Sequence, residues 1–330
     1  MITLGIDVSK QTLAVAAWQQ ERAVAWPPVT NTPDGWVQLA AQVPAQETVR
    51  LVLEPSGGYE LPLALWAHQR GWQVVRPNPR AVRDWARSQG HRAKTDRQDA
   101  LVLARFGTQV NVPLWQPLAQ EVSELDQLLR WRADIQTHLQ QARTRQQQIL
   151  AHPQQHPAVI KGSEQRITAL EEEQAACEQA IRDHLAQHPA MQQQATVLRS
   201  VPGIGAKNVL PVLVLLSRWD TLTGGQGTSK GLVALVGLDP TPQESGTSVW
   251  HHPHISRQGD REIRRLLYMG ALGALRCVSG VVRQGYERLV GRGKAKRLAL
   301  VASARKILTW AWAVFHSGLP FDPVKAGLVI

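Results

Sequence analysis

Apolar and polar positions in the first hundred residues follow the spacing of strands and short helices. Strands are expected near residues 2–7, 12–18, 23–29, 49–54 and 72–76, where β-branched and alternating apolar residues concentrate. Thr32-Pro33-Asp34 predicts a helix start, with proline at the first helical position. Helices are also expected near residues 60–70, 79–88 and 96–106. The N-terminal third is therefore predicted to be mixed α/β.

Between residues 118 and 188 the apolar spacing becomes that of long helices. One apolar residue recurs at every seventh position: Leu128, Ile135, Ala142 and Ile149. A weaker stripe follows over residues 167–181, and the prolines within 152–157 must interrupt the helix. This pattern predicts a helical hairpin. Two uses stay open for it: a coiled coil for self-association, and packing of the helices on their own domain.

Residues 190–330 are predicted to form a third, mostly helical part. Gly- and Pro-rich turns are expected at 202–205, 224–231 and 237–246, and the clearest helices near 259–284 and 296–315. The chain would thus divide into residues 1–110, 111–190 and 191–330. Three strands followed by alternating helices and strands is the element order of an RNase H-like domain, and a generic doubly wound domain is the competing interpretation of the first part.

Composition narrows the class of protein. Apolar residues make up 43% of the 330 positions, which predicts a globular chain with at least one large core. No run of 18 uninterrupted apolar residues occurs, so no transmembrane helix is expected, and we see no basic signal-peptide start. Two cysteines give neither a disulfide framework nor a zinc-site spacing, which fits a reducing cytoplasm.

The excess positive charge lies in the last part of the chain. Residues 191–330 contain 18 basic and 7 acidic side chains, which accounts for the whole net charge of +11. A basic region of this size attracts polyanions through counterion release. A well-solvated surface is the alternative, because net charge alone does not define function.

Four acidic residues occupy positions that suit a metal site. Asp7 and Glu54 end two predicted strands, and Asp96 and Asp99 lie three residues apart at the start of a predicted helix. Carboxylates at strand ends can converge at one edge of a sheet. Mg²⁺ prefers such hard oxygen ligands and keeps positions open for phosphate oxygens, and two metal ions could stabilise the attacking and leaving oxygens of a phosphodiester. Lys94, beside this set, is a candidate phosphate contact.

A second candidate is the turn Val201-Pro-Gly203-Ile-Gly205, which is expected to open a helix at Ala206. Free backbone N–H groups at such a turn suit phosphate binding, and the turn looks like a helix-hairpin-helix element that grips the DNA backbone. Gly203, Gly205 and Lys207 are then nucleic-acid contacts. A tight packing turn is the alternative.

The third candidate region surrounds Ser245, which precedes a glycine in a predicted turn. An exposed serine hydroxyl becomes a nucleophile only when a base or a metal activates it. Composition alone does not favour Ser245 over Ser248 or Ser256. Basic side chains further along are candidate phosphate contacts: Arg257, Arg261, Arg264, Arg265, Lys294, Lys296 and Arg297.

Taken together, the motifs resemble those of one protein family. They are Gly5-Ile-Asp7-Val-Ser-Lys, Glu54-Pro-Ser-Gly-Gly-Tyr-Glu, Pro77-Asn-Pro, Ala93-Lys-Thr-Asp96-Arg-Gln-Asp99-Ala, Val201-Pro-Gly-Ile-Gly, Ser245-Gly and Ile255-Ser-Arg-Gln-Gly. In this order, over nearly the whole chain, they resemble the insertion-sequence transposases with a DEDD signature, the relatives of the Piv DNA invertase. One departure is Asp260, which stands where an amide residue is common.

The resemblance implies a RuvC-like first domain whose carboxylates Asp7, Glu54, Asp96 and Asp99 bind Mg²⁺, a coiled-coil hairpin, and a C-terminal transposase domain. It implies Ser245 as covalent nucleophile, in a composite site built across the protomers of a dimer or tetramer. It also implies as partners the DNA of element ends and target, together with a structured guide RNA, at the nucleoid of a prokaryotic cell and with no membrane involved.

These implications predict a transposase or DNA recombinase that breaks and rejoins phosphodiesters. Two alternatives remain. The first is a RuvC-like Holliday-junction nuclease that uses water as the nucleophile. The second is a non-catalytic nucleic-acid-binding assembly protein with degenerate carboxylates, against which the intact set of four argues.

Overall fold

The computed structural model describes residues 1–90, 95–245, 249–277 and 280–324, with the side chains of 242–253 excepted. Two compact units are present. The first consists of residues 1–117 together with Thr221–Thr223, and the second of the other described residues from Leu118 onward. Each unit has its own hydrophobic core.

A five-stranded mixed sheet forms the centre of the first unit. Its strands are β1 Ile2–Val8, β2 Thr12–Gln19, β3 Arg22–Thr30, β4 Val49–Leu53 and β5 Gln73–Val75, arranged in the order β3-β2-β1-β4-β5. Strand β2 is antiparallel to both β1 and β3, whereas β4 runs parallel to β1 and β5 parallel to β4. All five predicted strands are confirmed to within two residues at either end.

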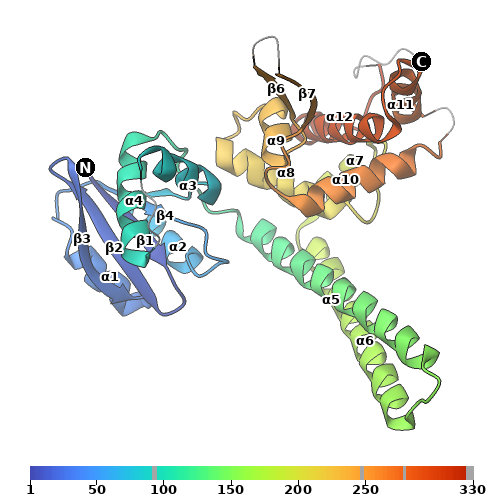
Figure 1. Cartoon of the computed structure of the whole chain (residues 1–330), viewed down its shortest axis with the longest axis horizontal. Helices are drawn as coiled ribbons and strands as arrows, with labels where there is room; N and C mark the ends of the chain where they lie inside the picture. The colour runs from blue at the N-terminus through green and yellow to red at the C-terminus, as the bar shows by residue number, and fades with distance from the viewer. Residues whose placement is uncertain (91–94, 246–248, 278–279, 325–330) are drawn as a thin grey trace. The chain divides into compact units, whose positions relative to one another are not determined.

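Helices cover both faces of this sheet (Figure 1). They are α1 Pro33–Ala41, α2 Leu61–Gln69, α3 Pro79–Ser88 and α4 Asp96–Gln109. Strand residues that alternate toward one face, such as Leu4 and Ile6, join the core with Leu39 of α1 and Leu63 of α2. The helix start predicted at Thr32 is confirmed, because its side chain accepts a hydrogen bond from the N–H of Gly35.

Small residues let α4 lie close to the other face of the sheet. A Cβ atom on Gly5 of β1 would stand 2.2 Å from the carbonyl oxygen of Ala100 and 2.2 Å from the nitrogen of Ala104. Such distances are far inside van der Waals contact, so only glycine fits this position. Ala16 of β2 packs at the same place with Ala100 and Ala104.

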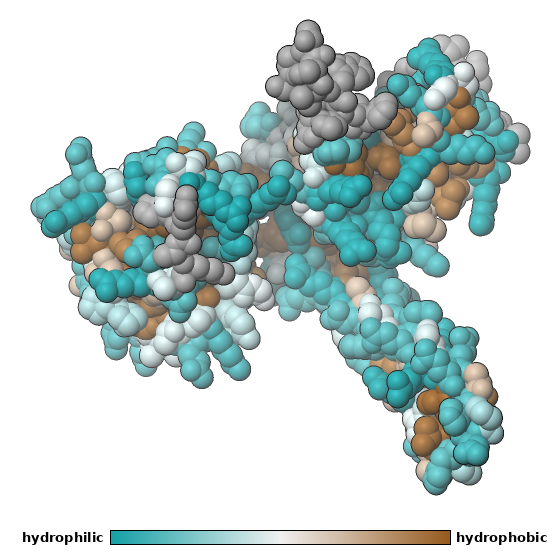
Figure 2. All heavy atoms as spheres, in the orientation of Figure 1, coloured by the Kyte–Doolittle hydropathy of each residue, from teal (hydrophilic) through white to brown (hydrophobic). Residues whose placement is uncertain are grey.

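The second unit begins with the predicted helical hairpin, formed by α5 Gln120–Ala151 and α6 Pro157–Gln187 (Figure 1). Near its base, Leu125 and Ile135 of α5 are buried in one core with Cys177 of α6. The seam of α5 therefore packs within the chain's own hairpin and domain. At the far end Leu150 and Val159 are exposed, and Figure 2 shows hydrophobic side chains on that end of an otherwise hydrophilic hairpin.

The rest of the second unit is helical with one β-hairpin. Its elements are α7 Pro189–Leu198, α8 Val209–Thr223, α9 Ser229–Val236, β6 Pro240–Ser245, β7 Val249–Ile255, α10 Arg261–Ala274, α11 Val281–Gly291 and α12 Lys296–Ser317. Helix α12 is long and apolar enough to span a membrane, but half of its apolar window is buried. Ile307, Leu308 and Ala311 lie in the domain core, as expected of a core helix.

Several predicted boundaries in this unit were wrong. The single helix expected near 259–284 is two helices, because α10 ends at Ala274 and α11 starts after its cap Gly280. The helix expected from Ala206 starts at Val209. The turns expected at 224–231 and 237–246 were too long, because α9 begins inside the first and β6 occupies most of the second.

Candidate active site

Asp7 and Glu54 lie at the same edge of the sheet. Strands β1 and β4 are parallel, and their register pairs Ile6 with Leu53, so the two carboxylates come directly after paired positions. Asp7 is two residues beyond Gly5, the residue against which α4 packs, and therefore points to the α4 face of the sheet. Both acidic residues are half-buried.

Helix α4 crosses that face antiparallel to β1. Gly107, near its C-terminus, lies against Thr3 and Val52, whereas Ala100 lies against Gly5. The first turn of α4, with Asp96 and Asp99, is thereby directed to the end of β1 where Asp7 stands. Thr95 caps this turn by accepting a hydrogen bond from the N–H of Gln98 at 3.2 Å. The first turn of α4 thus lies toward the end of the sheet that carries Asp7 and Glu54.

The oxygen atoms of these carboxylates are further apart than the ligands of one bound metal ion would be. Within the described part of the chain, three ligand atoms of different residues come within 4.8 Å of one another at one place, formed by Glu124, His184 and His188 of the second unit. As a donor set, four carboxylates fit a hard divalent cation.

The turn after Glu54 is organised by a buried carboxylate that the sequence analysis did not identify. Glu60 is 1% exposed. It accepts hydrogen bonds from the N–H of Ser56 at 3.0 Å and from the N–H of Gly58 at 3.0 Å, and it pairs with Arg76 at 2.5 Å. Burial raises the pKa of Glu60, but the backbone N–H donors and Arg76 more than compensate, so its pKa lies below the ordinary range.

The structure describes the backbone of Ser245 and the hydrogen bonds of Ser256, two of the three candidate serines. Ser245 is the last residue of β6, where its backbone pairs with Val249, and its side chain and Ser248 lie outside the described residues. The hydroxyl of Ser256 donates to the carboxylate of Asp239, and its N–H donates to the Asp239 carbonyl at 3.0 Å. Ser256 is therefore committed to holding β7 against the preceding loop.

The turn at residues 201–205 is packed rather than open. Gly203 has φ +94°, and a Cβ there would stand 2.5 Å from a methyl group of Ile307 and 3.2 Å from the carbonyl oxygen of Gly270 in α10. Buried Asn208 donates to the Gly203 carbonyl at 2.9 Å and accepts the Gly205 N–H at 2.7 Å. One of the two amides expected to face phosphate is thus already bonded, and Lys207 is exposed beside the turn.

Arg264 and Arg257 stabilise the loop between β7 and α10. The guanidinium of Arg264 donates to three carbonyl oxygens, at Val236, Gln258 and Gly259. Arg257 adopts a left-handed conformation with φ 56°, and its N–H donates to the Gly237 carbonyl. Asp260, the departure noted in the motif, is the N-cap of α10 and accepts from two backbone N–H groups.

The other predicted phosphate contacts are mostly free to meet solvent. Arg261, Lys294, Lys296 and Arg297 are exposed. Arg265 is exposed but pairs with Glu262, which lowers the pKa of that carboxyl. Lys94 lies outside the described residues. The exposed basic side chains between α11 and α12 are the clearest candidate surface for a polyanion.

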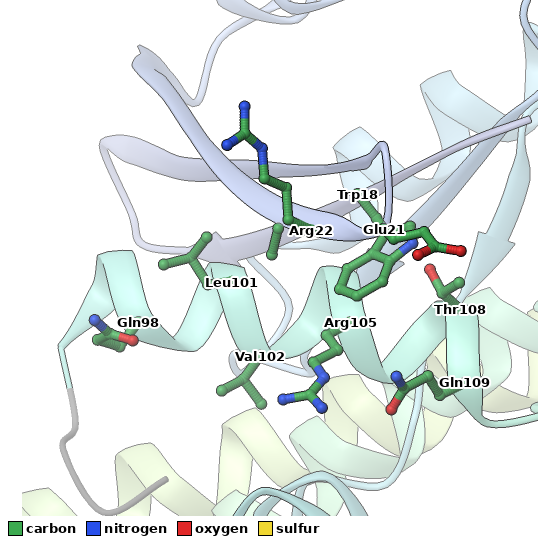
Figure 3. A pocket seen from close by; sticks show the side chains of 10 residues that line it. Trp18, Glu21, Arg22, Gln98, Leu101, Val102, Arg105, Thr108 and Gln109 are labelled. Carbon is green, nitrogen blue, oxygen red and sulfur yellow. The ribbon is translucent and has the colours of Figure 1, made fainter. Parts of the chain in front are cut away.

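A groove of about 680 Å³ lies on the first unit, along another side of α4. It is lined by Trp18 and Arg22 from the β2–β3 hairpin and by Gln98, Leu101 and Arg105 of α4 (Figure 3). Two arginines, an aromatic ring and the carboxylate of Glu21 thus share a groove that the sequence did not predict. Asp99 is directed to the sheet instead, so α4 presents different chemistry on two faces.

Comparison with known proteins identifies the class of protein to which this arrangement belongs. Residues 4–153 match a family described as DEDD transposase of the IS110 type, and residues 195–287 match the transposase family IS116/IS110/IS902. The first match contains all four carboxylates, and the second contains Ser245 and the turn at residues 201–205. The chain is therefore a DNA recombination enzyme of the transposase class.

The relatives agree with this class. The chain is 30% identical to the pilin gene-inverting protein of Moraxella lacunata over 333 residues, which cover 97% of both chains, and equally similar to that of Moraxella bovis. It is 30% identical over 168 residues to the insertion element IS110 uncharacterized 43.6 kDa protein of Streptomyces coelicolor, covering 50% of this chain and 38% of that protein. The chain belongs to the IS110-type transposase family.

Proposed function

We propose that the first unit is an RNase H-like domain of the RuvC type whose carboxylates Asp7, Glu54, Asp96 and Asp99 bind Mg²⁺. The observation that carries this proposal is the parallel register of β1 and β4, because it sets Asp7 and Glu54 side by side on the face where α4 begins. The strand order β3-β2-β1-β4-β5 with β2 antiparallel supports the fold assignment. When bound, Mg²⁺ supplies a Lewis acid for a phosphate oxygen.

We further propose that Ser245 is the nucleophile for strand exchange. Its Oγ would attack a backbone phosphorus, forming a phosphoserine ester while the bond from phosphorus to the leaving sugar oxygen breaks. The hydroxyl proton would leave to solvent or to a nearby base, and the sugar oxygen would depart as a hydroxyl after taking up a proton. The position of Ser245 at the end of β6 supports this role, as does the hydrogen bond that commits the Ser256 hydroxyl to Asp239.

The exposed basic side chains of the second unit are proposed to hold the DNA of element ends and target. A structured guide RNA is proposed to select the sequences by base pairing, which leaves the protein to contact backbone phosphates. Self-association of the chain, as a dimer or a tetramer, is proposed to use the far end of the hairpin, where Leu150 and Val159 are exposed.

The test is a covalent adduct between the protein and DNA. The full chain is incubated with labelled DNA spanning the element ends, with RNA transcribed from the flanking segment, and with Mg²⁺ or EDTA. Denaturing electrophoresis is expected to show labelled protein with Mg²⁺ only. Ser245→Ala and Asp7→Asn should each reduce the adduct by at least about 1,000-fold, as removal of a catalytic group does.

Matched controls are Ser248→Ala, three residues further along the chain, and Asp84→Asn, an exposed acid of α3 in the first unit. Both are expected to form the adduct at the wild-type level. An adduct that persists in Ser245→Ala would refute the nucleophile assignment. Cut DNA with free ends and no adduct, unchanged by Ser245→Ala, would instead indicate a nuclease that uses water.

A further inference from the structure

The base of the hairpin brings together three side chains that the transposase chemistry does not use. Glu124 lies near the start of α5, His184 near the end of α6, and His188 at the junction of α6 and α7. One ligand atom from each of these residues lies within 4.8 Å of the other two. Two imidazoles and a carboxylate thus converge on one point of the second unit.

Hydrogen bonding fixes the tautomer of the buried member of this group. His184 is 8% exposed, and its Nε2 lies 2.8 Å from the carbonyl oxygen of Glu121. A carbonyl oxygen only accepts, so Nε2 of His184 carries a hydrogen. In the neutral ring the lone pair is then on Nδ1, which lies 3.7 Å from the Glu124 carboxylate. Metal-binding histidines are commonly oriented by this kind of bond from their other ring nitrogen to a carbonyl.

The ring of His188 lies next to the ring of His184. His188 follows His184 by four residues, as the residue that caps the end of α6, and the centroids of the two rings are 4.6 Å apart. Two nitrogen ligands and one oxygen ligand suit cations of the Zn²⁺ class, whereas Mg²⁺ prefers oxygen ligands alone. The donor set therefore differs in kind from the four carboxylates of the first unit.

Access from solvent is provided by an open groove beside these residues. Its volume is about 600 Å³, and Gln127, Trp131 and Asp183 line it together with Glu124 and His184. A cation bound by three protein ligands keeps a coordination position for water, and the groove gives that water room.

We propose that Glu124, His184 and His188 bind one divalent transition-metal cation of the Zn²⁺ class. The site is structural: it links the start of α5 to the end of α6, positions sixty residues apart in the sequence. Because the three ligands converge only in the folded chain, the free energy of binding the cation adds to the stability of the base of the hairpin. This inference does not depend on the proposed Mg²⁺ site or on Ser245.

The experiment titrates Zn²⁺ into the purified full chain in competition with a chromophoric chelator, with Mg²⁺ in large excess to occupy oxygen-rich sites. The wild type is expected to bind one tight equivalent. His188→Gln and Glu124→Gln are each expected to weaken that equivalent by at least about 100-fold, since losing even an outer partner of a ligand costs 10–100-fold. His138→Gln, at an exposed histidine of α5, is the matched control and should bind as the wild type does.

Co²⁺ absorption in the visible range provides a second readout, because a tetrahedral protein site absorbs much more strongly than the octahedral aqua ion, and circular dichroism checks that each variant folds. Absence of a tight equivalent in the wild type would overturn the proposal, as would full binding by both variants. Neither result would bear on adduct formation by Ser245, so failure of the two proposals can be told apart.

Discussion

Among single residues, Glu60 has the clearest effect on the shape of the active-site edge. Its carboxylate holds the backbone of the turn that follows Glu54 and is itself fixed by Arg76. Charge-assisted hydrogen bonds from buried donors are among the stronger polar interactions in proteins. Glu60 therefore acts as a positioning residue for the proposed ligand Glu54.

Replacing Glu60 by glutamine is expected to lower the free energy of unfolding of the first unit by roughly 1.5–3 kcal/mol at pH 7. Because the pKa of Glu60 is lowered in the folded state, its charge-dependent contribution is complete above the unfolded pKa of about 4.3. That contribution is lost as the pH falls through the lower folded pKa. Urea denaturation of wild type and Glu60→Gln should show a difference that is largest near neutrality and shrinks in acid.

A difference in unfolding free energy that stayed constant down to pH 3 would contradict this account, because it would mean that the charge of Glu60 does not stabilise the fold. Asp84→Asn, on exposed α3, is a suitable control and is expected to change stability by less than about 0.5 kcal/mol at every pH.

Some site residues were predictable from the sequence and others were not. Asp7 and Glu54 were found because each ends an apolar run, and Asp96 and Asp99 because of their helical spacing. Glu60 was missed, since nothing local reveals that a carboxylate is buried against an arginine sixteen residues later. His184 and His188 have a visible spacing, but Glu124 lies far from them in the chain.

At the scale of elements, the close contact of α4 with β1 decides where Asp96 and Asp99 are held. At Gly5 the backbone of β1 contacts the backbone of α4, so no side chain can move away to remove the clash that an added Cβ atom would cause. Gly5→Ala is expected to destabilise the first unit by about 1–3 kcal/mol and to reduce Mg²⁺-dependent adduct formation.

The same substitution at Gly162 is the matched control. Gly162 is exposed within α6, and an added Cβ there meets nothing within 4 Å. Gly162→Ala is expected to stabilise the chain by about 0.5–1 kcal/mol. Urea denaturation followed by tryptophan fluorescence measures both, and equal effects of the two substitutions would refute the close-packing argument.

The elements also show where sequence patterns fail. Strands and helices of the first unit have strong signals, such as alternation in β1 and the Thr32-Pro33 start of α1. The break between α10 and α11 has no proline, and only Gly280 marks it. Strand β6 contains two prolines, which led to its prediction as part of a turn. It forms a strand because it pairs with β7, a contact that the local sequence does not reveal.

At the scale of the whole molecule, self-association is the prediction that the hairpin makes testable. Burial declines toward its far end, where Leu150 is 49% and Val159 51% exposed. If this end pairs with a second copy, Leu150→Ser combined with Val159→Ser should lower the molar mass measured by light scattering at concentrations where the wild type is associated.

Val37→Ser is the control for that experiment, because Val37 is a comparably exposed apolar residue at 56% on α1. It is expected to leave the molar mass unchanged. A double variant with the wild-type mass would show that the tip of the hairpin is not an interface, and that the seven-residue repeat serves only the packing of α5 inside its own unit.

The two faces of α4 have a mechanical consequence. One face bears Asp99 and meets β1 backbone to backbone, and another lines the groove with Arg105 and Gln98. Because α4 contacts β1 through backbone atoms and not through adaptable side chains, the helix moves as a unit. A ligand that bound in this groove and displaced α4 would therefore also displace Asp96 and Asp99, the proposed metal ligands in its first turn.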